Sequence, residues 1–100
     1  MFARLRVIIS SEEICDYEMI KQLLLDMNPH FSISPSREYA GIKDHSEFFA
    51  TLEIKEEEVQ PLLDLLNNDW DGDMDDCVCY GFNTKMFHQL VYCLEFCLFD

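Results

Sequence analysis

The stretch Phe2-Ala3-Arg4-Leu5-Arg6-Val7-Ile8-Ile9 stands near the start of the chain and alternates between two kinds of side chain over most of its length. One face is apolar throughout and consists of Ala3, Leu5, Val7 and Ile9. The other face carries both arginines. A period of two residues is typical of a β-strand with one buried face. We therefore expect a strand that packs one side on a core and leaves the other side more polar.

Two helices and a pair of strands are predicted after this strand. Residues 10–13 have the spacing of a capping box from Ser10 to Glu13, and a helical apolar pattern then runs to Asn28-Pro29. Residues 31–54 alternate on both sides of a polar turn at 43–46, which predicts a hairpin. Residues 55–66 begin with three glutamates and continue with an apolar stripe, which predicts a second helix. Pro61 fits that helix only in its first turn or at a kink.

The last quarter of the chain predicts two more strands. The first covers residues 77–82, and a turn is expected at 81–85. Residues 87–99 are apolar on both faces, as in a central strand, although a buried helix is the alternative. The first six elements match a ferredoxin-like split β-α-β layout, an antiparallel sheet with two helices on one face. With the C-terminal strand added, we predict one α+β domain over residues 1–100, in the order βαββαββ.

Residues 56–76 hold nine carboxylates and no lysine or arginine, out of a net charge of −13 for the 100-residue chain. This run ends in the acidic loop, Asp69-Trp70-Asp71-Gly72-Asp73-Met74-Asp75-Asp76. Folding presses such charges together, and this is tolerable if the loop stays hydrated or if something positive binds there. A chain this acidic is poorly suited to direct contact with nucleic acid or an anionic membrane, since both need a basic patch. It suits a basic protein partner.

The acidic loop supplies the predicted partner-binding residues: Asp69, Trp70, Asp71, Asp73, Asp75 and Asp76. In an extended chain, the aspartates at 69, 71, 73 and 75 would project from one side every ~6.6 Å, twice the strand rise. Such a ladder coarsely imitates a phosphate backbone. Tryptophan is enriched at interface hot spots, so Trp70 is the candidate anchor. Two alternatives remain open: a solvated loop with no role, and a Trp70 ring that packs on its own core.

Catalytic, metal and cofactor chemistry find little support in the sequence. None of the three histidines lies in a recognisable catalytic context, and there is no glycine-rich phosphate loop. Counted from Asp69, a calcium loop would need glycine at its sixth position and glutamate at its twelfth, and both are missing. Cys77-Val78-Cys79 lies in a strand-like run that cannot wrap a zinc ion, so we expect reduced, buried thiols. We predict a protein that is not an enzyme and holds no metal or cofactor.

The second face of the predicted sheet lacks helices, yet its last strand is apolar on both sides. We therefore expect that face to be covered by a partner, and a homodimer is one form this could take. No signal peptide and no apolar run of membrane-spanning length are recognisable, which predicts a soluble, cytoplasmic protein.

In size, acidity and compact α+β layout the chain resembles bacterial immunity proteins that neutralise nuclease toxins, including those of contact-dependent growth inhibition systems. The resemblance is one of overall type and covers the whole chain loosely. It implies a tight one-to-one complex with a basic cognate toxin and no catalysis. The alternatives are a phage-type acidic inhibitor of a nucleic-acid machine, such as an anti-CRISPR protein, and a ferredoxin-like regulatory domain that binds a small molecule or a metal.

Overall fold

The alternating stretch Phe2–Ile9 forms β1, a strand in the interior of a single antiparallel sheet. The computed structural model describes residues 1–83 and 85–100. It pairs β1 with β4 (Ser46–Glu53) on one side and β7 (Val91–Phe99) on the other. The four apolar residues of the alternating face are buried, as their spacing predicts. This strand therefore anchors the core from the middle of the sheet.

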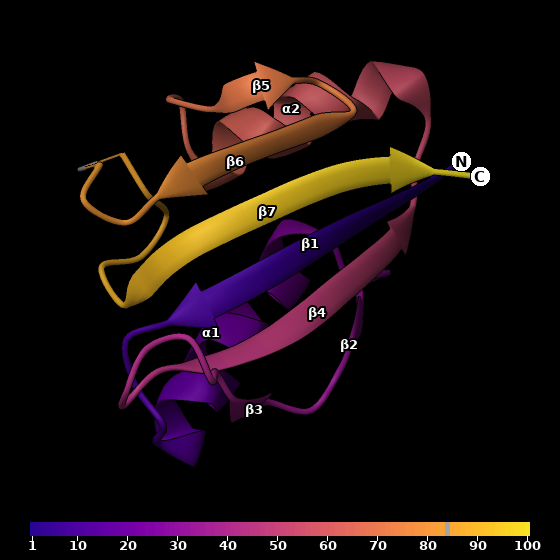
Figure 1. Cartoon of the computed structure of the whole chain (residues 1–100). Helices are drawn as coiled ribbons and strands as arrows, with labels where there is room; N and C mark the ends of the chain where they lie inside the picture. The colour runs from indigo at the N-terminus through magenta and orange to yellow at the C-terminus, as the bar shows by residue number, and fades with distance from the viewer. Residues whose placement is uncertain (84) are drawn as a thin grey trace.

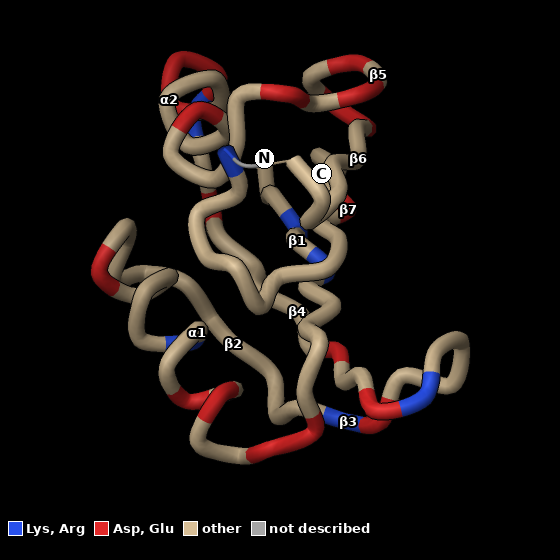
Figure 2. Tube along the Cα trace, turned by 90° about the vertical axis from the view of Figure 1, so that its left-hand side faces the viewer, with Lys and Arg blue, Asp and Glu red and all other residues tan. Residues whose placement is uncertain are grey.

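The described strands form one seven-stranded sheet in the order β2-β4-β1-β7-β6-β5, with β3 paired to β4 beside β2. The remaining four strands are short: β2 (Ser32–Ile33), β3 (Arg37–Glu38), β5 (Asp71–Asp73) and β6 (Asp76–Tyr80). Helices α1 (Ile14–Met27) and α2 (Glu56–Leu66) both lie on one face of this sheet, as the sequence predicts (Figure 1). Turning the molecule by 90° shows the opposite face without a helix (Figure 2). We call it the open face.

The helix boundaries follow local chemistry, with one correction to the predicted capping. Helix α1 begins at Ile14, and no side chain caps it, so the capping box predicted from Ser10 to Glu13 is wrong. Ser11 holds this turn instead, because its Oγ accepts a hydrogen bond from the Glu13 amide and donates one to Asp16. In α2 the Glu58 carboxylate accepts a hydrogen bond from the Lys55 amide at 2.9 Å. Pro61 lies inside α2, beyond its first turn.

The last strand occupies a different place from the one that the split β-α-β layout predicts. In that layout the sixth element would pair with β1, but β7 takes this position and β6 lies outside it. β7 lies between β1 and β6, as predicted for a central strand. Leu94 and Phe96 are buried on its helix side, whereas Glu95 is exposed on the open face. The strand also begins at Val91 rather than at residue 87. Of the turn predicted at 81–85, Thr84 lies outside the described residues.

Part of the open face is covered by the chain itself. The β3–β4 loop, residues 39–45, projects from the sheet on the side opposite the helices (Figure 2). Beneath it Ile8 of β1 and Cys93 of β7, which pair across the sheet, are 3% and 6% exposed. Glu47 of β4, which pairs with Ile8, is 5% exposed, while Glu95 and Phe99 farther along β7 are exposed. In the described part of the chain, no helix combines the length and the apolar character needed to cross a membrane.

Candidate functional site

The acidic loop folds into a hairpin rather than an extended ladder. Asp73 of β5 pairs with Asp76 of β6, and Met74 and Asp75 form the turn between them. Gly72 permits this closure, because its φ is +117° and a Cβ there would lie 2.6 Å from the Asp76 carbonyl oxygen. The predicted ladder of aspartates 69, 71, 73 and 75 is therefore wrong. We call residues 71–80 the acidic hairpin.

Strand register places three of these aspartates on the open face. Directly paired residues project to the same side of a sheet. Asp71 pairs with Val78, Val78 with Glu95 and Glu95 with Arg6, so all four project to the face that carries the arginines of β1. Asp73 and Asp76 continue the next row through Cys97 to Arg4. Asp75 lies in the turn, and Asp69 precedes the hairpin.

The Trp70 side chain packs toward the helices, on the core side of the acidic hairpin. Its ring lies 6.2 Å from that of Phe96 in an edge-to-face arrangement, and its Nε1 donates a hydrogen bond to the Leu63 carbonyl of α2 at 2.9 Å. The ring is partly buried against the core. The structure thus gives Trp70 the intramolecular packing that the sequence left open as an alternative. Direct contact between Trp70 and a partner stays a prediction.

Asn67, which caps the end of α2, fixes the entry into the acidic loop. It is 1% exposed, and its Oδ1 accepts hydrogen bonds from the Asp69 amide at 2.9 Å and the Asn83 side chain at 2.6 Å. One buried amide therefore connects the helix end, the acidic loop and the turn after β6. Nothing in the local sequence shows that residue 83 folds back on Asn67.

All nine carboxylates of residues 56–76 are exposed. None forms an ion pair within residues 1–83 and 85–100. Figure 2 shows the acidic positions of α2 and β5 at one end of the molecule, away from α1. We call this set the acidic surface. Since these charges repel one another and no described cation neutralises them, the folded chain presents a region of strongly negative potential.

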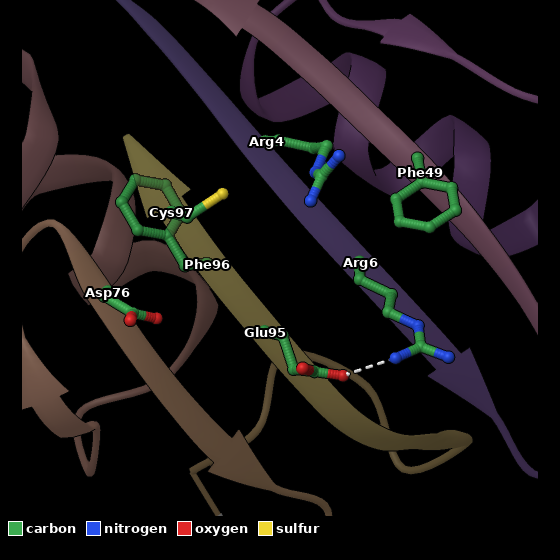
Figure 3. Close-up of a pocket in the computed structure, with 7 residues that line it drawn as sticks. All are labelled: Arg4, Arg6, Phe49, Asp76, Glu95, Phe96 and Cys97. Atoms are coloured by element: carbon green, nitrogen blue, oxygen red, sulfur yellow. Dashed lines mark hydrogen bonds and ion pairs between the residues drawn. The ribbon is translucent and has the colours of Figure 1, made fainter. Parts of the chain in front are cut away.

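The open face beside the acidic surface carries an arginine network. Arg6 donates hydrogen bonds to Glu47 at 2.8 Å and to Glu95 at 2.9 Å, and Arg37 donates to the other oxygen of Glu47 at 2.8 Å (Figure 3 draws the Arg6–Glu95 bond). Burial of Glu47 favours its neutral form, but the bonds from both arginines outweigh this and lower its pKa. Arg4 lies over the Phe49 ring at 5.4 Å. A cavity of about 250 Å³ separates this group from Asp76.

The three buried thiols, Cys77, Cys79 and Cys93, are unsuited to nucleophilic chemistry. Burial raises the pKa of Cys77 to about 11 and that of Cys79 to about 12, and it also raises the pKa of Cys93. These three thiols are therefore protonated at neutral pH. Cys77 and Cys79 project toward the core, while Cys93 projects to the open face. Across the described ranges, no three histidine, cysteine or acidic side chains are grouped so that they could hold a metal ion.

Comparisons of this chain with protein families, with curated proteins and with solved structures find no match. Its function is therefore inferred from the geometry of the acidic surface and the open face.

Proposed function

We propose that this chain is an acidic binding protein that captures a basic protein through its acidic surface. The observation that carries the proposal is that nine exposed carboxylates of residues 56–76 have no cationic partner among the described residues. A basic partner would relieve their mutual repulsion on binding and would be steered to this end of the molecule. The acidic hairpin holds Asp71, Asp73 and Asp76 on one side, where they can act together.

The partner class that we favour is a cognate nuclease toxin. A nuclease must present a basic cleft to bind phosphates, and a rigid array of carboxylates can occupy such a cleft. In this role the chain is an immunity protein of the cytoplasm, acts without catalysis or cofactor, and forms a one-to-one complex. The antiparallel sheet with its two helices then serves as the scaffold that holds the acidic hairpin in place.

The same acidic surface suits a second class of partner, a basic nucleic-acid machine blocked by a phage-type inhibitor. The two differ in what they bind: an immunity protein retains one toxin, whereas an inhibitor of the second type retains a component of a nucleic-acid-processing complex. A ferredoxin-like regulatory domain would instead bind its small ligand regardless of the carboxylates in the acidic hairpin.

Affinity purification from cells of the source organism tests the proposal. The bait is the wild-type chain, compared with a variant in which Asp71, Asp73, Asp75 and Asp76 are replaced by Asn. We expect a basic protein that the wild type retains at low salt and releases as salt rises, and that the variant binds at least about tenfold more weakly, because charge pairs across an interface set both steering and specificity. Nuclease activity of the retained protein, and its inhibition by this chain, then identifies the toxin.

A charge-matched control separates local from overall electrostatics. Replacing Glu12, Glu13, Glu18 and Asp26, four exposed carboxylates on or beside α1, by their amides changes the net charge by the same four units. This control should retain the partner with nearly wild-type affinity. Equal losses in both variants would show that only net charge matters, and unchanged binding by the Asn variant would remove the acidic hairpin from the interface.

A further inference from the structure

A cavity of about 540 Å³ lies on the open face between the β3–β4 loop and the acidic hairpin. Its lining combines three tyrosines and three carboxylates: Tyr39, Tyr80, Tyr92, Asp71, Asp76 and Glu95. We call it the trough. In Figure 2 the β3–β4 loop projects beyond the open face at one end of the sheet, while β5 lies at the other end. The residues that line the trough come from this loop and from β1, β5, β6 and β7.

Exposed aromatic rings border the trough. Tyr80 and Tyr92 are each 41% exposed, and Phe82, just after β6, is 86% exposed. The Tyr80 and Phe82 rings stack in parallel, with their centroids 5.5 Å apart. Single apolar residues at a surface are ordinary, but a stacked pair beside a cavity is a preorganised apolar platform. Tyrosine is also among the residues that most often dominate binding energy at interfaces.

Of the described residues that line the trough, the charged ones are all acidic, and none is a lysine or an arginine. Nearby Arg6 lies 5.4 Å from the Tyr39 ring, and Glu47 and Glu95 already hold its guanidinium. Asp71 and Asp76 have no ion-pair partner within the described ranges. Carboxylates beside tyrosine faces form a suitable receptor for arginine, which pairs with the oxygens and stacks on the rings.

We propose that the trough receives a basic amphipathic segment of the protein partner, with its arginines at Asp71 and Asp76 and its apolar side chains on the Tyr80–Phe82 pair. This rests on the proposed function and adds the place and chemistry of the main contact. It assigns the aromatic anchor of the interface to Tyr80 and Phe82 rather than to Trp70, which is engaged with Phe96 and α2. A second copy of this chain suits the trough poorly, because each copy has a net charge of −13.

A defined peptide tests the trough without the native partner. The probe is a synthetic peptide of leucine and arginine patterned as an amphipathic helix of about four turns. The comparison peptide has citrulline, a neutral isostere, in place of each arginine. Affinity is measured by isothermal titration at low and high salt, and the contact residues are mapped by amide chemical shifts. We expect the arginine peptide to bind at least about tenfold more tightly at low salt and to shift the amides around Tyr80 and Tyr92.

Variants decide which residues carry the binding. Phe82→Ser cannot disturb the core, since its ring is 86% exposed, and Asp71→Asn with Asp76→Asn removes the unpaired charges. Each should weaken peptide binding by about tenfold or more, while replacing Leu65, an exposed apolar residue of α2 that does not line the trough, by Ser should have no effect. Equal binding of the citrulline peptide, an equal loss in Leu65→Ser, or a dimer in light scattering that protects Tyr80 would overturn the proposal.

The native partner separates this inference from the proposed function. If the four-Asn variant loses the partner while Phe82→Ser retains it, the acidic surface binds the partner but the Tyr80–Phe82 pair is not its aromatic anchor, and the inference fails. If the peptide binds in the trough but the four-Asn variant still holds the partner, the proposed function fails and the trough stands as a separate site. If neither variant alters partner binding or peptide binding, both are wrong.

Discussion

Trp70 and Asn67 show how single residues hold the acidic hairpin in place from the core side. The Trp70 ring packs on Phe96 of β7 and donates to the Leu63 carbonyl, and buried Asn67 accepts two hydrogen bonds that converge from the acidic loop and the turn after β6. Neither role is visible in the local sequence, because each depends on residues far along the chain. Their contacts join the acidic loop to α2, to β7 and to the turn after β6.

Replacing Trp70 by Ala should therefore lower stability more than partner binding. We expect a loss of about 2–4 kcal/mol in the free energy of unfolding, measured by urea titration, because the change removes a partly buried ring and its hydrogen bond. Trp70→Phe keeps most of the packing and should lose only about 1 kcal/mol. An unchanged urea midpoint combined with weaker partner binding would instead make Trp70 an interface anchor.

The buried thiols of β6 should make the protein less stable in alkali. Burial raises the pKa of Cys77 to about 11 and of Cys79 to about 12, while a cysteine in the unfolded chain titrates near ~8.5. Between these values the unfolded chain has released protons that the folded chain still holds, so stability falls as pH rises. We expect the free energy of unfolding to decline from about pH 8.5 to 11.

A variant with alanine at both Cys77 and Cys79 identifies the source of this decline. The decline should be shallower in the variant, although its stability at neutral pH will be lower because of the lost side-chain atoms. A wild-type protein whose stability is constant over this range, or a variant with the same slope, would contradict the assignment.

At the level of elements, sequence periodicity located most of the fold and missed its connections. Both helices, the central strand β1 and the strand β4 were predicted close to their observed ranges, because alternation and helical spacing are local signals. The hairpin at β5 was not predicted, since a run of aspartates disfavours a strand and only pairing with β6 stabilises it. The central position of β7 was predicted from its apolar run, but its neighbours β1 and β6 could not be, because they depend on long-range pairing.

Gly72 is the residue on which the hairpin element depends most directly. We expect Gly72→Ala to open or distort the β5–β6 pairing, because the added methyl meets the Asp76 carbonyl and the φ of +117° is strained for alanine. The loss should be about 1–3 kcal/mol with the rest of the sheet intact. Amide exchange should show selective loss of protection in residues 71–78, and a fully protected hairpin in the variant would contradict this reading.

At the scale of the whole molecule, the two faces of the sheet are covered to different extents, and the negative charge is concentrated at one end. Two helices cover one face of the sheet, while only the β3–β4 loop shelters part of the other (Figures 1 and 2). The acidic surface gathers at one end of the molecule, next to the trough on the open face. This arrangement suits a binding protein, because one side of the sheet forms the core and the other presents charged and aromatic side chains to a partner.

The candidate site was predicted in composition but not in shape. The sequence located the carboxylates of residues 56–76, because charge clusters are visible in one dimension. It did not predict that Tyr80, Phe82 and Tyr92 lie beside them. Tyr80 ends β6, Phe82 follows it, and Tyr92 belongs to β7, so only the folded sheet brings these rings near the carboxylates. Aspartate spacing also suggested a ladder, which the turn at Met74 and Asp75 excludes.

The central claim is that the carboxylates of the acidic hairpin serve a partner and not the fold. The most direct measurement compares the free energy of unfolding and the partner affinity of the wild type with those of the variant carrying Asn at 71, 73, 75 and 76. We expect equal or higher stability at low salt, because repulsion is relieved, together with at least about tenfold weaker binding. A variant that unfolds more easily yet binds its partner unchanged would contradict the account.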